Sequence, residues 1–575
     1  MSLSKGVRRS ARLREVAAAL REINRDQYRI NQLCAQSARE AALAAKAVSS
    51  DTPTQNATQT PADSTPLTTP KGYGAAHKGN HSEKWKSAED KEWNGLWKRG
   101  TFRDEQYTGQ RLHRLLWTYK VKADGTPKAR LCIDGRQQDP STYDNISSPT
   151  MRLTSFRTLL SVAAQNHWGI DADDATQAFV NAFRPEDKPL WASYPQGRRN
   201  NGRCLKVLRH LYGSHDAAMG WFDLLKDHLV NDHKMTQSRN DKCYFYRDDL
   251  HVVVHVDDLA STGPPAARAA FRKKLHAKFD MTGGEIDIYY GLNVIVTDGK
   301  VKLTAENYIE KAMEKLQLQP RSWRTPLDPN VELQRADKCT DAVLHKRYRS
   351  LVGSVLHAST TCRPDVAVAA RELASHLQAP TQQHVNAAIR AMQYLHATRK
   401  LGLVYTGTND RSNTDFYGTC DASHNTTWDA KGITGWAYHL NGGAISWHCK
   451  AQPLTALSST EAELIAIDSA VRELRHLHKL LAEFKLQVKM PTTIGQDNQS
   501  TIKLCESTHF NARTKHISLR YHHCGDQQRA GIVKLEYLPT AHCRHRERRA
   551  DEAAATGSTL QASRSTIRRA THSMA

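Results

Sequence analysis

The chain has 575 residues, of which 81 are Lys or Arg and 59 are Asp or Glu, and its formal net charge is +22. A chain of this length buries a large core without disulfide bonds. Its 11 scattered cysteines form no CxxC pair, which argues against a secreted disulfide scaffold and indicates a reducing, intracellular compartment. The apolar stretches are too short to cross a bilayer, so a membrane protein is not expected. The positive charge favours a polyanionic partner, and a basic protein with solvated charges is the alternative.

The N-terminal region differs in composition from the rest of the chain. Residues 1–48 are rich in Arg and Ala, and their apolar side chains recur at helical spacing, which predicts a helix over 7–47. This helix is either a basic arm or partner helix, or an isolated surface helix or disordered tail. Ser49–Thr69 is rich in Ser, Thr, Pro and Gln and is typical of a flexible linker.

The remaining chain shows ordered patterns in three stretches. Residues 85–327 mix strand and helix signals, 341–407 are mostly helical, and 415–470 alternate strands and turns before a long helix begins. After Asp551 the sequence becomes small and polar again, which predicts a tail.

Two adjacent aspartates follow a β-branched run. Cys243–Tyr246 and His251–Val256 are predicted as the strands of a hairpin, and Asp257 and Asp258 lie just beyond it. Adjacent carboxylates repel each other, and two Mg²⁺ ions roughly 3.5–4 Å apart would relieve this while activating a 3′-hydroxyl and stabilising a leaving pyrophosphate. Asp174 is the candidate third carboxylate, from a neighbouring strand. An ordinary solvated turn is the alternative.

Four further acids lie at element ends in the C-terminal part. Asp421 ends a short strand, Glu463 lies in the first turn of a helix capped by Ser458–Thr460, Asp497 lies where a strand meets a helix, and Asp551 begins a last helical stretch. Carboxylates from different elements are what a second two-metal site requires. Four unrelated surface acids are the alternative.

Several segments resemble the palm motifs of copia-type retrotransposon reverse transcriptases: DATQAFVNA (Asp174–Ala182), LRHLYG (Leu208–Gly213) and HVDD (His255–Asp258). Flanking segments match the family in order, among them KARLCIDGRQQ (Lys128–Gln138) and ISWHCKAQPLTALSSTEAEL (Ile445–Leu464). Ordered matches from about residue 85 to residue 551 are more specific than any single motif. The later segments resemble the ribonuclease H domain that follows the polymerase in these elements, so the chain is similar to the polymerase end of a larger polyprotein.

The resemblance implies roles for individual residues of the polymerase site. Asp174, Asp257 and Asp258 would be the metal ligands. Asp171 and Asp173 are rivals of Asp174, which is preferred because the family motif places Ala-Phe four residues after the ligand.

Three further residues would bind the incoming nucleotide. Phe179 would exclude a ribose 2′-hydroxyl, or it is a core residue. Lys128 and Arg130 would hold triphosphate oxygens, or they are solvated strand charges.

For the nuclease site, the resemblance implies that Asp421, Glu463, Asp497 and Asp551 are the metal ligands. Glu461 is interpreted as a helix-capping or solvated residue. Nearby histidines and cysteines lack a C-x₂-C or H-x₃-H pair, so solvated or phosphate-facing histidines are favoured over structural zinc. These residues are His522, His523, Cys524, His542, Cys543 and His545.

Three positions depart from the family pattern. His255 stands where the family usually has Tyr, Ser214-His215-Asp216 replaces Leu-Lys-Gln, and Ala218 replaces Pro. Asp216 would place a negative charge near an incoming triphosphate, which predicts weaker nucleotide binding by electrostatic repulsion.

The sequence therefore predicts an α/β (α+β) chain that is an RNA-directed DNA polymerase with hybrid ribonuclease activity. It would use two Mg²⁺ ions per site, with Mn²⁺ possible, and bind an RNA template, a DNA primer, the RNA–DNA hybrid and deoxynucleoside triphosphates. A catalytically lapsed nucleic-acid-binding protein and a hybrid ribonuclease alone are the alternatives. A cytoplasmic particle, the nucleus or both are the expected locations.

The expected segments are a basic helix and linker at 1–84, fingers and palm at 85–330, a helical thumb or connection at 331–410, a ribonuclease H-like mixed sheet at 411–555 and a tail at 556–575.

Overall fold

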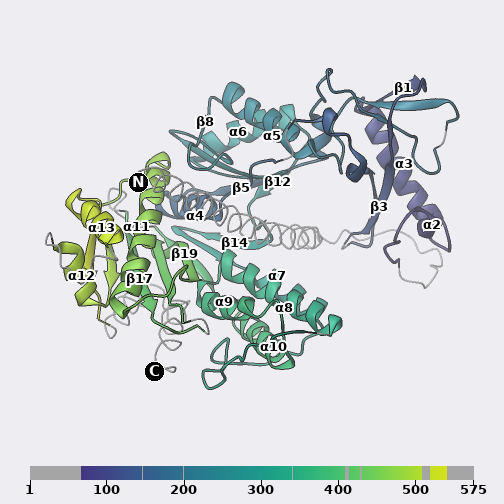
Figure 1. The fold of residues 1–575 in the computed structure, drawn as a ribbon. Helices are drawn as coiled ribbons and strands as arrows, with labels where there is room; N and C mark the ends of the chain where they lie inside the picture. The colour runs from purple at the N-terminus through teal and green to yellow at the C-terminus, as the bar shows by residue number, and fades with distance from the viewer. Residues whose placement is uncertain are drawn as a thin grey trace, which may run out of the picture.

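The computed structural model describes residues 67–122, 124–144, 147–198, 200–339, 341–407, 414–427, 430–507 and 518–539. Three units follow one another along the chain, and we name them the N-terminal unit (67–287), the middle unit (288–407) and the C-terminal unit (414–539). Figure 1 shows the N-terminal unit at one end, in purple and blue, and the helices of the C-terminal unit at the other. The predicted helix over 7–47, Asp551 and the tail lie outside the described residues.

The first half of the N-terminal unit combines a long helix with two small sheets. Its elements are α2 (Tyr73–Ala76), α3 (Ser82–Lys98), β1 (Phe102–Gln106), β2 (Leu112–His113), β3 (Leu115–Val121), β4 (Pro127–Ile133), the 3₁₀ turns η1 (Gly135–Gln137) and η2 (Pro140–Thr142), β6 (Trp191–Ala192) and β7 (Arg203–Val207). Strands β3 and β4 form an antiparallel hairpin, and the second sheet has the order β1-β7-β6-β2. Helix α3 packs Trp93 and Leu96 against this region through its buried face.

The second half of the N-terminal unit is built on an antiparallel six-stranded sheet. Its elements are α4 (Leu153–Asn166), β5 (Ile170–Ala175), η3 (Ala178–Asn181), α5 (Ala217–Asp227), the π-helical η4 (His228–Asp232), β8 (Thr236–Gln237), β9 (Tyr244–Arg247), β10 (Leu250–His255), β11 (Asp258–Thr262), α6 (Pro265–Lys278) and β12 (Met281–Glu285). The strand order is β12-β5-β11-β10-β9-β8. The predicted hairpin is present, with its turn at Asp248 and Asp249.

The middle unit joins a four-stranded sheet to four helices. Its elements are β13 (Ile288–Tyr289), β14 (Leu292–Thr297), β15 (Lys300–Thr304), α7 (Glu306–Lys315), α8 (Ala342–Thr361), η5 (Pro364–Val366), α9 (Ala367–Ser375), α10 (Gln382–Ala397) and β16 (Gly402–Thr406). The strand order is β13-β14-β15-β16. The predicted helical stretch is confirmed, but β15 pairs with β16 across the expected boundary at residue 330. Composition does not reveal such a pairing, because its strands are far apart in sequence.

The C-terminal unit is a mixed sheet with helices against it. Its elements are β17 (Phe416–Ser423), β18 (Ile433–Leu440), β19 (Gly443–Ala451), α11 (Ser459–Glu483), β20 (Thr492–Gln496), α12 (Gln499–Glu506), α13 (Ser518–Arg529) and β21 (Val533–Tyr537). The strand order is β19-β18-β17-β20-β21, in which β17 pairs with β18 antiparallel and with β20 parallel. The predicted cap Ser458 accepts a hydrogen bond from the Glu461 amide at 3.1 Å and starts the long helix α11.

One hydrophobic core runs through all three units, from Phe156 in α4 to Leu535 in β21. Within the described residues, no helix has the length and apolar character needed to cross a membrane.

A buried arginine joins the three units. Arg157 of α4 donates hydrogen bonds to the carbonyls of Thr361 at the end of α8 (2.8 and 3.1 Å) and of Ile445 in β19 (3.1 Å), and it also bonds to Thr360. Its guanidinium carbon lies 3.8 Å from the centre of the Trp447 ring. Burial lowers the pKa of Arg157 to about 10, so the group stays charged at neutral pH. The last carbonyls of a helix carry partial negative charge, which stabilises this cation.

Replacing Arg157 by Met should weaken the joint between the units. The carbonyls of Thr361 and Ile445 would lose their donors in a buried place, and we expect a loss of about 3 kcal/mol of stability. Urea denaturation followed by tryptophan fluorescence measures this, because Trp447 lies in the joint. Arg349→Met, on the exposed side of α8, is the matched control. Equal midpoints for the two variants would contradict the assigned role.

Buried histidines make the fold sensitive to acid. Burial lowers the pKa of each of four such histidines to about 4, whereas the unfolded chain takes up these protons near pH 6.5. Stability should therefore fall as the pH drops from about 6.5 to about 4, by up to about 1.4 kcal/mol per pH unit for each histidine. Denaturant midpoints at several pH values measure the slope. The four residues are His233, His251, His357 and His384.

The variant His357→Met removes one of these histidines. It should therefore reduce the dependence of stability on pH by the contribution of one proton. The exposed His215 provides the control, because His215→Met should leave the slope unchanged. A slope that His357→Met does not alter would refute the assignment.

Candidate active sites

Three of the predicted carboxylates meet at one end of the six-stranded sheet. Asp174 on β5 lies directly opposite Asp258, the first residue of β11, and Asp257 occupies the turn before it. Ligand oxygens of the three residues all lie within 4.8 Å of one another, and all three side chains are partly buried. We call these residues the first acid group.

The turn that carries Asp257 is held from both sides. Val256 adopts a left-handed backbone conformation (φ 59°), which an L-residue rarely adopts. Its carbonyl accepts a hydrogen bond from the Trp221 indole at 2.7 Å, and the Asp257 carbonyl accepts one from the Ala175 amide at 2.9 Å. These bonds fix the position of Asp257 relative to β5.

The two rivals of Asp174 point to the other face of β5. Asp171 pairs with Arg268 at 2.6 Å, and Asp173 pairs with Arg272 at 3.0 Å and with His276 at 2.8 Å, all from α6. Because side chains alternate along a strand, these two aspartates cannot join Asp174. Their charges are neutralised within the fold.

The predicted phosphate-binding cations lie on β4. Lys128 is exposed and Arg130 is half-buried, with its guanidinium 4.7 Å from the centre of the Tyr212 ring. Phe179, in η3, packs against the same tyrosine with ring centres 5.0 Å apart. Burial raises the pKa of Tyr212 to about 12, and the charge of Asp257 adds to this shift. Tyr212 thus links Arg130 and Phe179 to the first acid group.

Sequence reasoning missed two residues at this site. Tyr212 stands in the LRHLYG motif, so the motif itself was the signal. Glu92 of α3 lies outside every motif, yet it is buried and accepts a hydrogen bond from the Gln177 amide group at 3.0 Å. Burial raises the pKa of Glu92, while the nearby Arg130 and Lys128 oppose this shift.

Asp216, one of the departures from the family pattern, has a buried charge partner. Asp216 is buried and receives two hydrogen bonds from Arg184, at 2.8 and 3.0 Å. Burial would raise its pKa, but His210 and Arg184 outweigh this and hold the pKa well below its usual range. Its charge is compensated by Arg184, and the electrostatic repulsion of a triphosphate by Asp216 stays a prediction. A second departure, His255, packs edge-on against Tyr290, with ring centres 4.6 Å apart.

A second acid group lies in the C-terminal unit. Asp421 on β17, Glu463 on α11 and Asp497 after β20 place ligand oxygens within 4.8 Å of one another. Burial and the charges of Asp421 and Asp497 raise the pKa of Glu463 to about 9, against a hydrogen bond of 2.9 Å from the Gln496 amide group. The fourth predicted ligand, Asp551, lies outside the described residues.

Glu461 has a different task from Glu463. Its carboxylate accepts a hydrogen bond from the Leu457 amide at 2.7 Å, while the Ser458 hydroxyl accepts one from the Glu461 amide. This reciprocal arrangement resembles a capping box, so the interpretation of Glu461 as a capping residue is confirmed.

Both acid groups suit divalent cations. Each gathers three carboxylates whose mutual repulsion a cation would relieve, and hard oxygen ligands are those that Mg²⁺ prefers. Burial contributes most to the raised pKa of Glu463, and the repulsion from Asp421 and Asp497 adds to it.

Comparisons with known proteins identify the N-terminal part of the chain. Residues 107–327 match the family described as reverse transcriptase (RNA-dependent DNA polymerase). The Pol polyprotein of transposon TNT 1-94 from Nicotiana tabacum is 30% identical over 465 residues, covering 76% of this chain and 34% of the relative. That of transposon RE1 from Arabidopsis thaliana is 28% identical, covering 74% and 30%. The chain thus spans about a third of the length of these relatives.

A solved structure of a foamy viral protease-reverse transcriptase in complex with RNA/DNA hybrid is 14% identical, with a TM-score of 0.46, and the match covers 79% of this chain and 54% of that one. The family resemblance drawn from the motifs is confirmed by the sequence matches. Residues 107–327 belong to the reverse transcriptase family, and over 76% of its length the chain is a relative of the copia-type retrotransposon Pol polyproteins.

Proposed function

We propose that this chain is an RNA-directed DNA polymerase that also hydrolyses the RNA strand of an RNA–DNA hybrid. The observation that carries the proposal is the first acid group, whose three aspartates lie within 4.8 Å of one another inside the segment that matches the reverse transcriptase family. The substrates would be an RNA template, a DNA primer and deoxynucleoside triphosphates. The net charge of +22 suits the phosphate backbone of such partners.

At the first acid group, Asp174, Asp257 and Asp258 would hold two Mg²⁺ ions, with Mn²⁺ as a substitute. The ions would lower the pKa of the primer 3′-hydroxyl and neutralise charge on the leaving pyrophosphate. Arg130 would hold triphosphate oxygens, because a guanidinium can make two parallel hydrogen bonds to phosphate. Lys128 lies further out on the same strand and would add positive charge there.

Phe179 would contact the sugar of the incoming nucleotide and exclude a 2′-hydroxyl. Its ring is supported by Tyr212, which is itself covered by Arg130. This stack would couple the position of the sugar contact to the position of the phosphate contact.

At the second acid group, Asp421, Glu463 and Asp497, with Asp551, would hold the cations for hydrolysis of the RNA strand. The proposal is supported by the close approach of the three described carboxylates on three different elements of a mixed-sheet unit. The raised pKa of Glu463 means that cation binding would displace its proton.

The variant Asp257→Asn should abolish DNA synthesis. An amide cannot replace a carboxylate as a ligand that neutralises Mg²⁺, so we expect primer extension on an RNA template to fall by roughly a thousandfold or more. Asp248→Asn is the matched control, because Asp248 lies in the exposed turn of the same hairpin. Extension by Asp257→Asn at the rate of the unaltered chain would contradict the proposal.

The unaltered chain in this assay also decides between the alternatives. Incorporation with Mg²⁺ or Mn²⁺ supports the polymerase. Absence of incorporation with either ion would favour the catalytically lapsed nucleic-acid-binding protein, or the hybrid ribonuclease alone if the labelled RNA–DNA hybrid is still cleaved.

The variant Glu463→Gln should abolish cleavage of a labelled RNA–DNA hybrid, by roughly a thousandfold, and leave primer extension intact. Asp174→Asn should have the opposite pattern, so each variant is the control for the other. Burial and the neighbouring carboxylates raise the pKa of Glu463 and so favour its neutral form without a cation, and thermal stability in EDTA should therefore change little on substitution by Gln. Loss of both activities in both variants would contradict two independent sites.

A further inference from the structure

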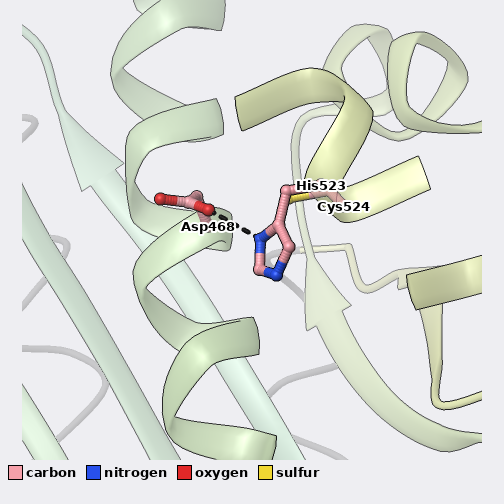
Figure 2. Close-up of side chains that lie close together, drawn as sticks. All are labelled: Asp468, His523 and Cys524. Atoms are coloured by element: carbon pink, nitrogen blue, oxygen red, sulfur yellow. Dashed lines mark hydrogen bonds and ion pairs between the residues drawn. The ribbon is translucent and has the colours of Figure 1, made fainter. Parts of the chain in front are cut away.

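A third cluster of side chains that offer possible metal ligands lies in the C-terminal unit, apart from the second acid group. Asp468 comes from α11, and His523 and Cys524 come from α13 (Figure 2). One ligand atom of each residue lies within 4.8 Å of the others. His523 Nδ1 and Asp468 Oδ1 are 2.8 Å apart.

Two of the three residues in the cluster are buried. Cys524 is fully buried, Asp468 is 7% exposed, and the His523 side chain retains more exposure. The second carboxylate oxygen of Asp468 accepts a hydrogen bond from Arg472 at 2.8 Å, which fixes the orientation of the carboxylate. The thiol of Cys505, on α12, is also buried and lies close enough to that of Cys524 to affect its pKa.

We propose that Asp468, His523 and Cys524, completed by Cys505, form a structural zinc site that joins α13 to α11 and α12. Zinc binds Cys sulfur, His nitrogen and carboxylate oxygen in tetrahedral sites, and four protein ligands are typical of structural zinc. The ligand atoms of Asp468, His523 and Cys524 already lie within 4.8 Å of one another, and the sulfur of Cys505 would turn toward them.

The charges balance in this arrangement. Zinc contributes two positive charges, and the Asp468 carboxylate and two thiolates contribute three negative ones. Arg472 offsets the remaining negative charge through its bond to Asp468. Both thiols would release their protons to solvent on binding, and His523 would bind as the neutral imidazole.

The spacing of these ligands along the sequence does not indicate a zinc site. His523 and Cys524 are adjacent in the chain, but their partner Asp468 stands 55 positions away from His523. The spacing of ligands within one segment therefore does not reveal it. Of the neighbouring histidines and cysteines in the sequence, His542, Cys543 and His545 lie outside the described residues.

Cobalt binding to the full chain tests the proposal. Co²⁺ added to the metal-free protein should give the near-ultraviolet absorption of a thiolate–cobalt bond, at one ion per chain, and Zn²⁺ should displace it. The carboxylates of the acid groups cannot give this band, so Glu463→Gln should leave it unchanged. Cys524→Ser should remove it, with zinc content falling roughly tenfold or more.

Two further variants separate this site from the other thiols of the chain. Cys449→Ser, which changes a half-buried thiol on β19, should retain the band. His523→Gln changes a more exposed residue and keeps the test valid if Cys524→Ser does not fold; it should weaken cobalt binding and shift the spectrum. No thiolate band, a band that survives Cys524→Ser, or an unchanged spectrum in His523→Gln would each overturn the proposal.

Discussion

The buried guanidinium of Arg157 sets a strict requirement on the rest of the structure. A buried cation is tolerated in a core only when its donors find acceptors. Here the acceptors are carbonyls from the end of α8 and from β19, and the Trp447 ring covers the charged face. Helix α4 leads into β5, which carries Asp174, and β19 shares a sheet with β17, which carries Asp421. The contacts of Arg157 therefore hold the elements that carry the two acid groups in a fixed relative position.

The need of a charged group for a compensating partner also explains how the aspartates of β5 are arranged. One face of this strand carries Asp171 and Asp173, whose charges are neutralised by cations of α6. The other face carries Asp174, which the antiparallel register brings next to Asp257 and Asp258. The ion pairs of Asp171 and Asp173 hold β5 against α6. The group of Asp174, Asp257 and Asp258 instead offers a site for cations. The distinction lies in the alternation of the strand and not in the residue type.

The sequence predicted that Asp174, Asp257 and Asp258 meet, because these residues stand in short motifs at strand ends. It could not reveal contacts between distant segments. Glu92 reaches Gln177 from another part of the chain, Arg157 reaches Ile445 in another unit, and β15 pairs with β16 across the expected boundary. Such contacts depend on the folded arrangement, which local periodicity and composition do not encode.

Asp216 shows that the effect of a residue that departs from a family motif depends on the charged residues around it in the fold. Taken alone, an added carboxylate near a phosphate site predicts repulsion. In the structure, Arg184 is buried beside it and also donates to the Thr142 carbonyl, so the two charges form a unit. Removing either member would leave the other buried without compensation, which costs more than the pair contributes. The departure is therefore matched by a charge partner within this core.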